Sequence, residues 1–266
     1  MTQPVAVVTG ASSGIGRALA RKLDEEQYAL VLCDLNEAGL RETQGLLKHG
    51  SQRVTLDVSK RAEIEAMAAD VLARHGRIDL VINNAGVTVD ARLADVSYED
   101  FEWLFGINFW GVVYGTKAFL PKMLEQKSGT IVNISSIFGI IAHPGQGTYN
   151  AAKFAVRGFT EALWRELEGS GVTAVCVHPG GVKTNIARSA RVPGAKGDEK
   201  QQLADRFERL AATTPEKAAE IILRGVHDKQ RRVMVGLDAQ LMALAQRLMP
   251  EGYPDLFDAL EKRVAK

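Results

Sequence analysis

Short apolar runs rich in β-branched residues alternate along this chain with helical stretches, and this alternation limits the fold more than any other feature. Several runs are apolar at nearly every position, which is typical of strands that are covered on both faces. The runs lie at residues 5–9, 29–33, 53–56, 80–83, 130–134, 172–177 and 231–236. Strand, helix and strand in repetition predict an α/β fold: a doubly wound parallel sheet of about seven strands, with helices on both faces and right-handed crossovers.

Domain organisation follows from the lack of any repeat or linker before about Ile186. We therefore expect one domain over residues 1–266, although that is long for a single domain. Residues 188–200 are small, basic and contain glycine and proline, which is typical of a mobile loop. Near the end of the chain, one helix is predicted with four leucines on one face, at Leu237, Leu241, Leu244 and Leu248. We expect this leucine face to pack on the domain or on a partner subunit rather than on a membrane.

Composition and charge exclude several classes of protein. Lys and Arg number 33 against 32 Asp and Glu, so a nucleic-acid binder that works through bulk charge is not expected. No run approaches ~18 apolar residues, and the N-terminus lacks the features of a signal peptide. Cys33 and Cys176 each lie in an apolar run, which indicates buried thiols in a reducing cytoplasm. The five histidines show no metal-ligand spacing, so no metal site is predicted.

A glycine-rich turn follows the first predicted strand directly. Its residues, Thr9 to Gly16, read T-G-A-S-S-G-I-G. Such glycines let the backbone approach a pyrophosphate, and the helix that follows offers free N–H groups to its charge. Tight packing of strand against helix is the alternative explanation. Asp34 ends the second run, where a carboxylate can accept hydrogen bonds from both hydroxyls of an adenosine ribose, although it could instead begin the next helix.

Five further motifs follow the glycine turn in one order. They are N-N-A-G at 83–86, N-x-x-G at 108–111, S-S-x-x-G at 135–139, Y-x-x-x-K at 149–153 and P-G at 179–180. With these motifs, residues 4–186 resemble the single-domain short-chain dehydrogenases/reductases. The resemblance implies a Rossmann-like fold and an NAD(P)-dependent oxidoreductase acting on CH–OH or C=O groups. It also implies a substrate lid at about 186–214, a helical C-terminal extension at about 237–266, and a homodimer or homotetramer built on the helices around Trp103 and Trp164.

The resemblance implies a catalytic tetrad of Asn108, Ser136, Tyr149 and Lys153. Ser136 is preferred to Ser135 because its 13-residue separation from Tyr149 resembles the family interval. In the family, Asn108 would hold a water that relays the proton, and Lys153 would hold the nicotinamide ribose.

The chemistry of the pair at 149 and 153 also follows from the residues. Tyr149 and Lys153 are four apart, hence on one helix face, although such a pair is more often a solvated packing contact. An adjacent ammonium and an oxidised nicotinamide would both favour the phenolate, so Tyr149 can exchange a proton with an alcohol or carbonyl. Ser136 can donate a hydrogen bond to the reacting oxygen, or it could simply cap a turn.

The same resemblance implies a cofactor site. Asp57 could instead cap the helix that begins near Lys60. We expect NAD(H) rather than NADP(H), because Ser13, Leu35 and Asn36 are uncharged and because Arg17 and Arg41 are expected to be solvated on helices. The predicted cofactor residues are Gly10, Ser12, Ser13, Gly14, Ile15, Gly16, Asp34, Asp57, Val58, Asn84, Ala85, Gly86, Tyr149, Lys153, Pro179, Gly180, Val182 and Thr184.

The substrate is predicted less closely. An apolar rim at Phe138, Ile140, Ile141, His143 and Pro144 favours a secondary alcohol or ketone with a sizeable apolar part. The alternatives are a 3-oxoacyl-thioester reductase, whose anionic carrier the basic segment after Ile186 would attract, and a non-catalytic nucleotide-sensing protein.

Overall fold

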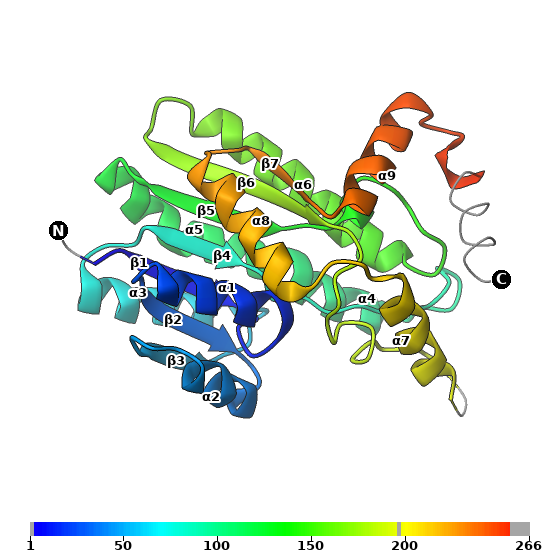
Figure 1. Cartoon of the computed structure of the whole chain (residues 1–266), viewed down its shortest axis with the longest axis horizontal. Coiled ribbons are helices and arrows are strands. Elements are labelled where there is room, and N and C mark those ends of the chain that lie inside the picture. Colours follow the sequence, from blue (N-terminus) through cyan, green and yellow to red (C-terminus); the bar gives the residue numbers. More distant parts are fainter. Residues whose placement is uncertain (1–2, 196–197, 256–266) are drawn as a thin grey trace.

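A computed structural model describes residues 3–195 and 198–255 of the chain and shows a seven-stranded parallel sheet between two layers of helices (Figure 1). The strand order is β3-β2-β1-β4-β5-β6-β7, so the predicted doubly wound fold is confirmed. The bounds are β1 Val5–Thr9, β2 Ala29–Asp34, β3 Ser51–Thr55, β4 Leu80–Asn83, β5 Gly129–Ile134, β6 Val172–Pro179 and β7 Arg232–Val235.

The chain reverses its direction of growth at β1, which pairs with β2 on one side and with β4 on the other. The helices that follow these two strands, α1 (Gly14–Glu25) after β1 and α5 (Gly111–Gln126) after β4, pack on opposite faces of the sheet. In open α/β sheets this switch point is where ligands bind. The glycine turn leaves β1 and the N-N-A-G loop leaves β4, so both motifs lie at the switch point.

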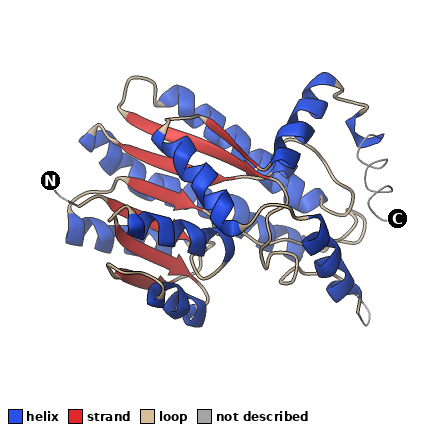
Figure 2. Cartoon of the chain, viewed as in Figure 1, coloured by secondary structure: helices blue, strands red, loops and turns tan. Residues whose placement is uncertain are grey.

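Two apolar cores lie on opposite faces of the sheet, because successive residues of each strand point to opposite faces. Ala6 and Val8 belong to the core beneath α1 and α8, while Val5 and Val7 belong to the core beneath α3, α5 and α6. Figure 2 shows these helices flanking the strands. Their bounds are α1 Gly14–Glu25, α2 Glu37–Gly45, α3 Arg61–His75, α5 Gly111–Gln126, α6 Gly147–Glu166 and α8 Pro215–His227.

The remaining helices gather beyond the carboxyl edge of the sheet (Figure 1). Helix α4, Tyr98–Phe105, continues through a π-helical turn, Gly106–Trp110, into α5. Helix α7, Glu199–Leu210, occupies part of the segment in which the sequence predicts only a lid, and it begins inside the loop predicted for 188–200. Among the described residues, no helix is long and apolar enough to span a membrane.

Helix α9, Leu237–Leu248, does not place its leucines as predicted. All four are more than half exposed, so the expectation that they pack on the domain is wrong. The helix instead packs through smaller residues: Ala239 is buried against Ile137, Ile140 and Ile141. Packing of the leucines on a partner subunit stays a prediction.

Candidate functional site

The glycine turn is shaped by close approaches of the backbone. Gly10 has a φ of +67°, and a Cβ on it would lie 2.9 Å from the Cα of Ala85. A Cβ on Gly16 would lie 2.1 Å from the carbonyl oxygen of Gly10. Packing alone therefore accounts for these two glycines. The turn also fits an anion, because α1 begins with no side-chain cap and no acidic residue in its first turn.

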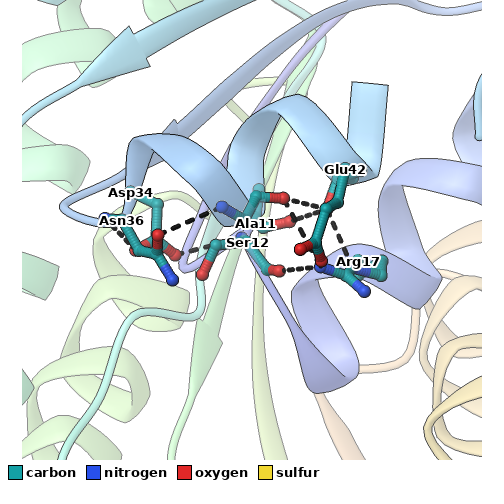
Figure 3. A network of polar contacts seen from close by, with 8 residues as sticks. Ala11, Ser12, Arg17, Asp34, Asn36 and Glu42 are labelled. Carbon is teal, nitrogen blue, oxygen red and sulfur yellow. Dashed lines mark hydrogen bonds and ion pairs between the residues drawn. The ribbon is translucent and has the colours of Figure 1, made fainter. Parts of the chain in front are cut away.

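Asp34 lies against this turn. Its Oδ2 accepts from the backbone N–H of Ser12 at 3.0 Å, and its Oδ1 accepts from the N–H of Asn36 at 2.9 Å (Figure 3). The cap of α2 is Asn36, whose side chain accepts from Gly39 N. The alternative in which Asp34 begins the helix is therefore wrong. The carboxylate stands beside the turn, as a ribose ligand would.

Arg17 is bonded to the same turn and to α2, so the solvated role expected for it is wrong. Its guanidinium pairs with Glu42 at 2.8 Å, donates to Thr43 Oγ1 at 3.0 Å and also reaches the carbonyl of Ser12 (Figure 3). Thr43 in turn donates to the carbonyl of Ala11 at 2.8 Å. Arg41, as expected, is exposed and pairs with Glu37 on its own helix.

The loop after β4 is tied to the end of β1 by a residue that the sequence analysis missed. Thr9 is buried, and its Oγ1 accepts from the N–H groups of Asn84 and Ala85 at 2.9 and 3.1 Å. The side chain of Asn84 donates back to the carbonyl of Thr9 at 2.9 Å. A threonine closing an otherwise apolar strand was the available signal.

Asp57 and Val58 follow β3. Asp57 Oδ1 accepts from both the N–H and the hydroxyl of Ser59, at 2.9 and 2.7 Å, so its carboxylate organises the turn before α3 rather than capping the helix itself. Val58 is buried, and a Cβ on Gly111 would lie 3.0 Å from its Cγ2. Both residues lie just beyond the carboxyl end of β3, before α3 begins.

The segment after β6 contacts β7, α9 and the glycine turn. Gly180 N–H donates to Val235 O at 2.9 Å, and Gly181 N–H donates to Asp238 of α9 at 2.6 Å. Val182 is buried. A Cβ on Gly14 would lie 3.1 Å from Thr184 Cγ2, so the structure brings these two predicted cofactor residues together.

Ser136, Tyr149 and Lys153 gather at the carboxyl ends of β4 and β5. Tyr149 and Lys153 lie on α6, and Lys153 Nζ lies 5.5 Å from the centre of the Tyr149 ring. This buried ammonium donates to the carbonyl of Ile134 at 2.9 Å. Ser136 begins the short 3-10 turn Ile137–Gly139, where its Oγ accepts from Phe138 N at 3.1 Å. The structure therefore brings the predicted polar groups to one place.

The neighbouring serine has a different partner. Ser135 Oγ donates to the carbonyl of Lys153 at 2.8 Å. A Cβ on Gly139 would lie 2.3 Å from Ser135 Oγ. Ser135 thus joins the end of β5 to α6.

Asn108 sits in the π-helical turn, a local irregularity that is frequent at functional sites. It is fully buried, and its side chain exchanges two hydrogen bonds of 2.8 Å with the backbone of Val87. A Cβ on Gly86 would lie 3.3 Å from Asn108 Oδ1 and 3.6 Å from Lys153 Nζ, so all three groups meet. The structure shows Asn108 as a tie to the loop after β4.

Burial dominates the titration of the Tyr149 and Lys153 pair. Desolvation raises the pKa of Tyr149 to about 12, and a hydrogen bond with Ser136 opposes the rise. Desolvation also lowers the pKa of Lys153 to about 8. Burial therefore disfavours the phenolate among the chain's own groups, and the expectation that an adjacent ammonium and an oxidised nicotinamide together favour it stays a prediction. The ammonium lies over the Tyr149 ring and bonds to Ile134, and Tyr149 itself is partly buried.

The predicted apolar rim is divided. Phe138 meets the Tyr149 ring edge-on at 6.2 Å between ring centres, and its other contact is a stack on His143 at 5.4 Å, so Phe138 lies between the phenol ring and His143 in this series of contacts. Ile140 and Ile141 are buried in the cluster under α9 instead.

Asn150, which the sequence analysis missed, holds this loop to α6. Its Nδ2 donates to the carbonyls of Phe138 and Ile141 at 2.9 and 2.7 Å, and its Oδ1 accepts from His143 N at 3.2 Å. An asparagine directly after the predicted catalytic tyrosine was the only signal.

The cysteines and possible metal ligands are further candidates for reactive groups. Cys33 and Cys176 are buried free thiols. Within residues 3–195 and 198–255, no group of three or more His, Cys, Asp or Glu side chains is arranged to hold a metal ion.

Comparison with known proteins places this geometry in a family. Residues 4–193 match the family model described as short chain dehydrogenase. The putative oxidoreductase SadH of Mycobacterium tuberculosis is 47% identical over 261 residues, which covers 96% of this chain and 94% of that protein.

Two solved structures are also similar. A short-chain dehydrogenase/reductase from Burkholderia phymatum in complex with NAD has a TM-score of 0.85 and 32% identity, covering 94% of this chain and 95% of that one. A metagenomic short-chain oxidoreductase in complex with NADP has a TM-score of 0.72 and 29% identity, covering 88% and 97%.

Proposed function

The chain belongs to the short-chain dehydrogenase family of oxidoreductases, and from that premise we propose that it transfers a hydride between NAD(H) and a secondary alcohol or ketone with a sizeable apolar part. The observation that carries the proposal is the meeting of Tyr149, Lys153 and Ser136 at the carboxyl edge of the sheet, the edge at which the glycine turn also lies. The bound cofactor supplies or accepts the hydride at its nicotinamide.

Tyr149 is proposed as the general acid and base. Its raised pKa keeps the phenol protonated at neutral pH, which is the form that donates a proton to a carbonyl oxygen as the alcohol forms. Ser136 donates a hydrogen bond to the same oxygen and stabilises the charge that develops there. Lys153 holds the cofactor ribose from beneath the tyrosine ring. The water assigned to Asn108 by the family resemblance stays a prediction.

The cofactor preference is proposed on charge. Asp34 bonds to Ser12 of the glycine turn and would accept hydrogen bonds from the adenosine ribose; a phosphate on that ribose would bring a dianion to a carboxylate. Arg17, the nearby cation, is already paired with Glu42 and bonded to the turn. Solved relatives include both NAD and NADP complexes, so the preference rests on these residues of the chain itself.

The assembly is proposed as a homodimer or homotetramer. The two tryptophans used in the sequence analysis are partly covered within the chain, by Arg191 on Trp103 and by Arg232 near Trp164. Exposed aromatic side chains lie nearby instead, at Trp110 and Phe154 of the same helical layer. A cytoplasmic location is likewise a prediction from the cysteine content.

The test is a screen that follows the absorbance of the reduced cofactor with NAD(H) and NADP(H). It covers secondary alcohols, aliphatic and cyclic ketones, steroids and 3-oxoacyl thioesters. Turnover of ketones or alcohols supports the proposal. Turnover confined to the thioesters identifies the alternative reductase, and tight cofactor binding with no turnover identifies a nucleotide-sensing protein.

A further inference from the structure

His178 is a buried titratable residue that the proposed chemistry leaves unused. It is the last residue but one of β6, and none of its surface is exposed. Its Nδ1 lies 2.9 Å from the carbonyl oxygen of Ser136. Because a carbonyl oxygen only accepts, Nδ1 must carry the proton.

The second ring nitrogen has no partner. Nε2 is buried, and no hydrogen-bonding group of the described chain reaches it. A buried acceptor with no partner destabilises the fold, and an apolar side chain of similar size would avoid it. The Nδ1–H bond is therefore the interaction that distinguishes histidine from leucine at this position.

This bond begins where the backbone ladder between β5 and β6 ends. The last ladder bond runs from Ser135 N to Val177 O at 2.8 Å. At the next residue the chain leaves β5, and the Ser136 carbonyl accepts from Gly139 N of the 3-10 turn and from the His178 ring. The ring thus attaches Ser136 to β6 one residue beyond the ladder.

We propose that His178 is a positioning residue for Ser136: its neutral ring, protonated at Nδ1, fixes the peptide from which the Ser136 hydroxyl projects toward Tyr149. The inference rests on the proposed function, because it gives Ser136 a role toward the reacting oxygen. The proposal adds His178 of β6 to Ser136, which follows β5, and to Tyr149 and Lys153 of α6.

Burial keeps this ring neutral. Burial lowers the pKa of His178 to about 4; Arg232 of β7 and Arg157 of α6 lower it as well, while Glu161 of α6 and the bond to Ser136 raise it. The fixed proton on Nδ1 is therefore maintained at neutral pH.

Two substitutions separate positioning from packing. His178→Asn keeps an N–H donor as many bonds from the backbone as Nδ1, whereas His178→Leu fills similar space with no donor. We expect His178→Leu to lower kcat by about tenfold or more, with KM and the NAD(H) Kd within about twofold, and His178→Asn to stay within about threefold of wild-type kcat. Equal losses in both variants, or wild-type kcat in His178→Leu, overturn the proposal. Assays well below both melting temperatures exclude unfolding as the cause.

A second measurement does not depend on turnover. In protein with ¹⁵N-labelled histidine, the His178 signals are those that disappear in His178→Asn, and we expect the Nδ1–H tautomer at neutral pH. An Nε2–H tautomer overturns the positioning role whatever substrate is found. If no alcohol, ketone or thioester is turned over, the proposed function fails, and the tautomer alone then decides whether His178 holds Ser136.

Discussion

The cofactor end and the substrate end of this site are built by different means. Around the glycine turn, close approaches of the backbone set the shape: Gly10 and Gly16 leave no space for a Cβ, and side chains such as Arg17 add support. Around Tyr149, hydrogen bonds of side chains set the shape: Asn150 of α6 holds the loop after β5, and His178 of β6 bonds to Ser136. A site made by backbone geometry has few acceptable sequences, whereas one made by side chains can change its ligand by substitution.

The largest expected effect is a loss of turnover without a loss of cofactor binding when the phenol of Tyr149 is removed. Tyr149→Phe should lower turnover by more than about 100-fold while the NAD(H) Kd stays within about twofold, because only the proton donor is deleted. Steady-state kinetics and a cofactor titration measure the two quantities. Lys153→Ala serves as the companion variant and should damage both. Retention of more than about a tenth of wild-type turnover by Tyr149→Phe would show that the acid lies elsewhere.

The matching disruption of the cofactor end is Gly16→Ala. The added Cβ meets the carbonyl oxygen of Gly10 at 2.1 Å, and backbone cannot move aside cheaply. We expect a loss of about 1–3 kcal/mol in the free energy of unfolding, together with weaker NAD(H) binding. Gly45→Ala in α2 is the control, since nothing lies within 4 Å of its Cβ; it should change stability by less than about 1 kcal/mol. Denaturant unfolding of both variants makes the comparison, and similar losses would contradict it.

A smaller effect tests the charge at the cofactor end. The wild type should prefer NAD(H) by at least about tenfold in kcat/KM, since a lost charge-assisted hydrogen bond alone costs ~1.5–3 kcal/mol. Asp34→Ala should shrink that ratio, mainly by improving NADP(H). Asp34→Asn keeps one oxygen, for the N–H of Ser12 or of Asn36, and removes the charge, so it tests the repulsion with less disturbance of the turn than Asp34→Ala. Equal wild-type efficiency with both cofactors would eliminate the assignment.

The smallest effect is a pH dependence at the substrate end. Between an ordinary pKa of 6.5 and the lowered pKa of about 4, the unfolded chain takes up a proton at His178 that the folded chain does not. Stability therefore falls as pH falls through this window, by about 1 kcal/mol between roughly pH 7 and 5.5. His178→Asn should remove this part of the dependence. Denaturant unfolding at several pH values provides the data, and parallel curves for the two proteins would refute it.

At both ends the sequence predicts the local patterns but not the contacts between distant elements. The seven strands and the glycine turn are local patterns, so apolar periodicity and motif spacing suffice for them. The bond from His178 to Ser136 joins residues 42 apart, and that from Arg17 to Thr43 joins residues 26 apart. Neither pairing has a local signal, because each depends on how distant elements pack. Helix α9 shows the same limit: its leucines form an apolar stripe, yet its small residues make the contact.

The position of β1 in the sheet constrains the order in which the chain can acquire its structure. Synthesis delivers β1, β2 and β3 first; β2 then lies between the other two, and β1 is paired on one side only. The other edge of β1 is covered when β4 arrives, about a quarter of the chain later, with Ala6 opposite Leu80 and Val8 opposite Ile82. Until then a nascent polypeptide presents an apolar strand edge, the kind of surface that promotes misassembly. The switch point that defines the site is therefore created by the same late pairing that ends this vulnerable stage of biosynthesis.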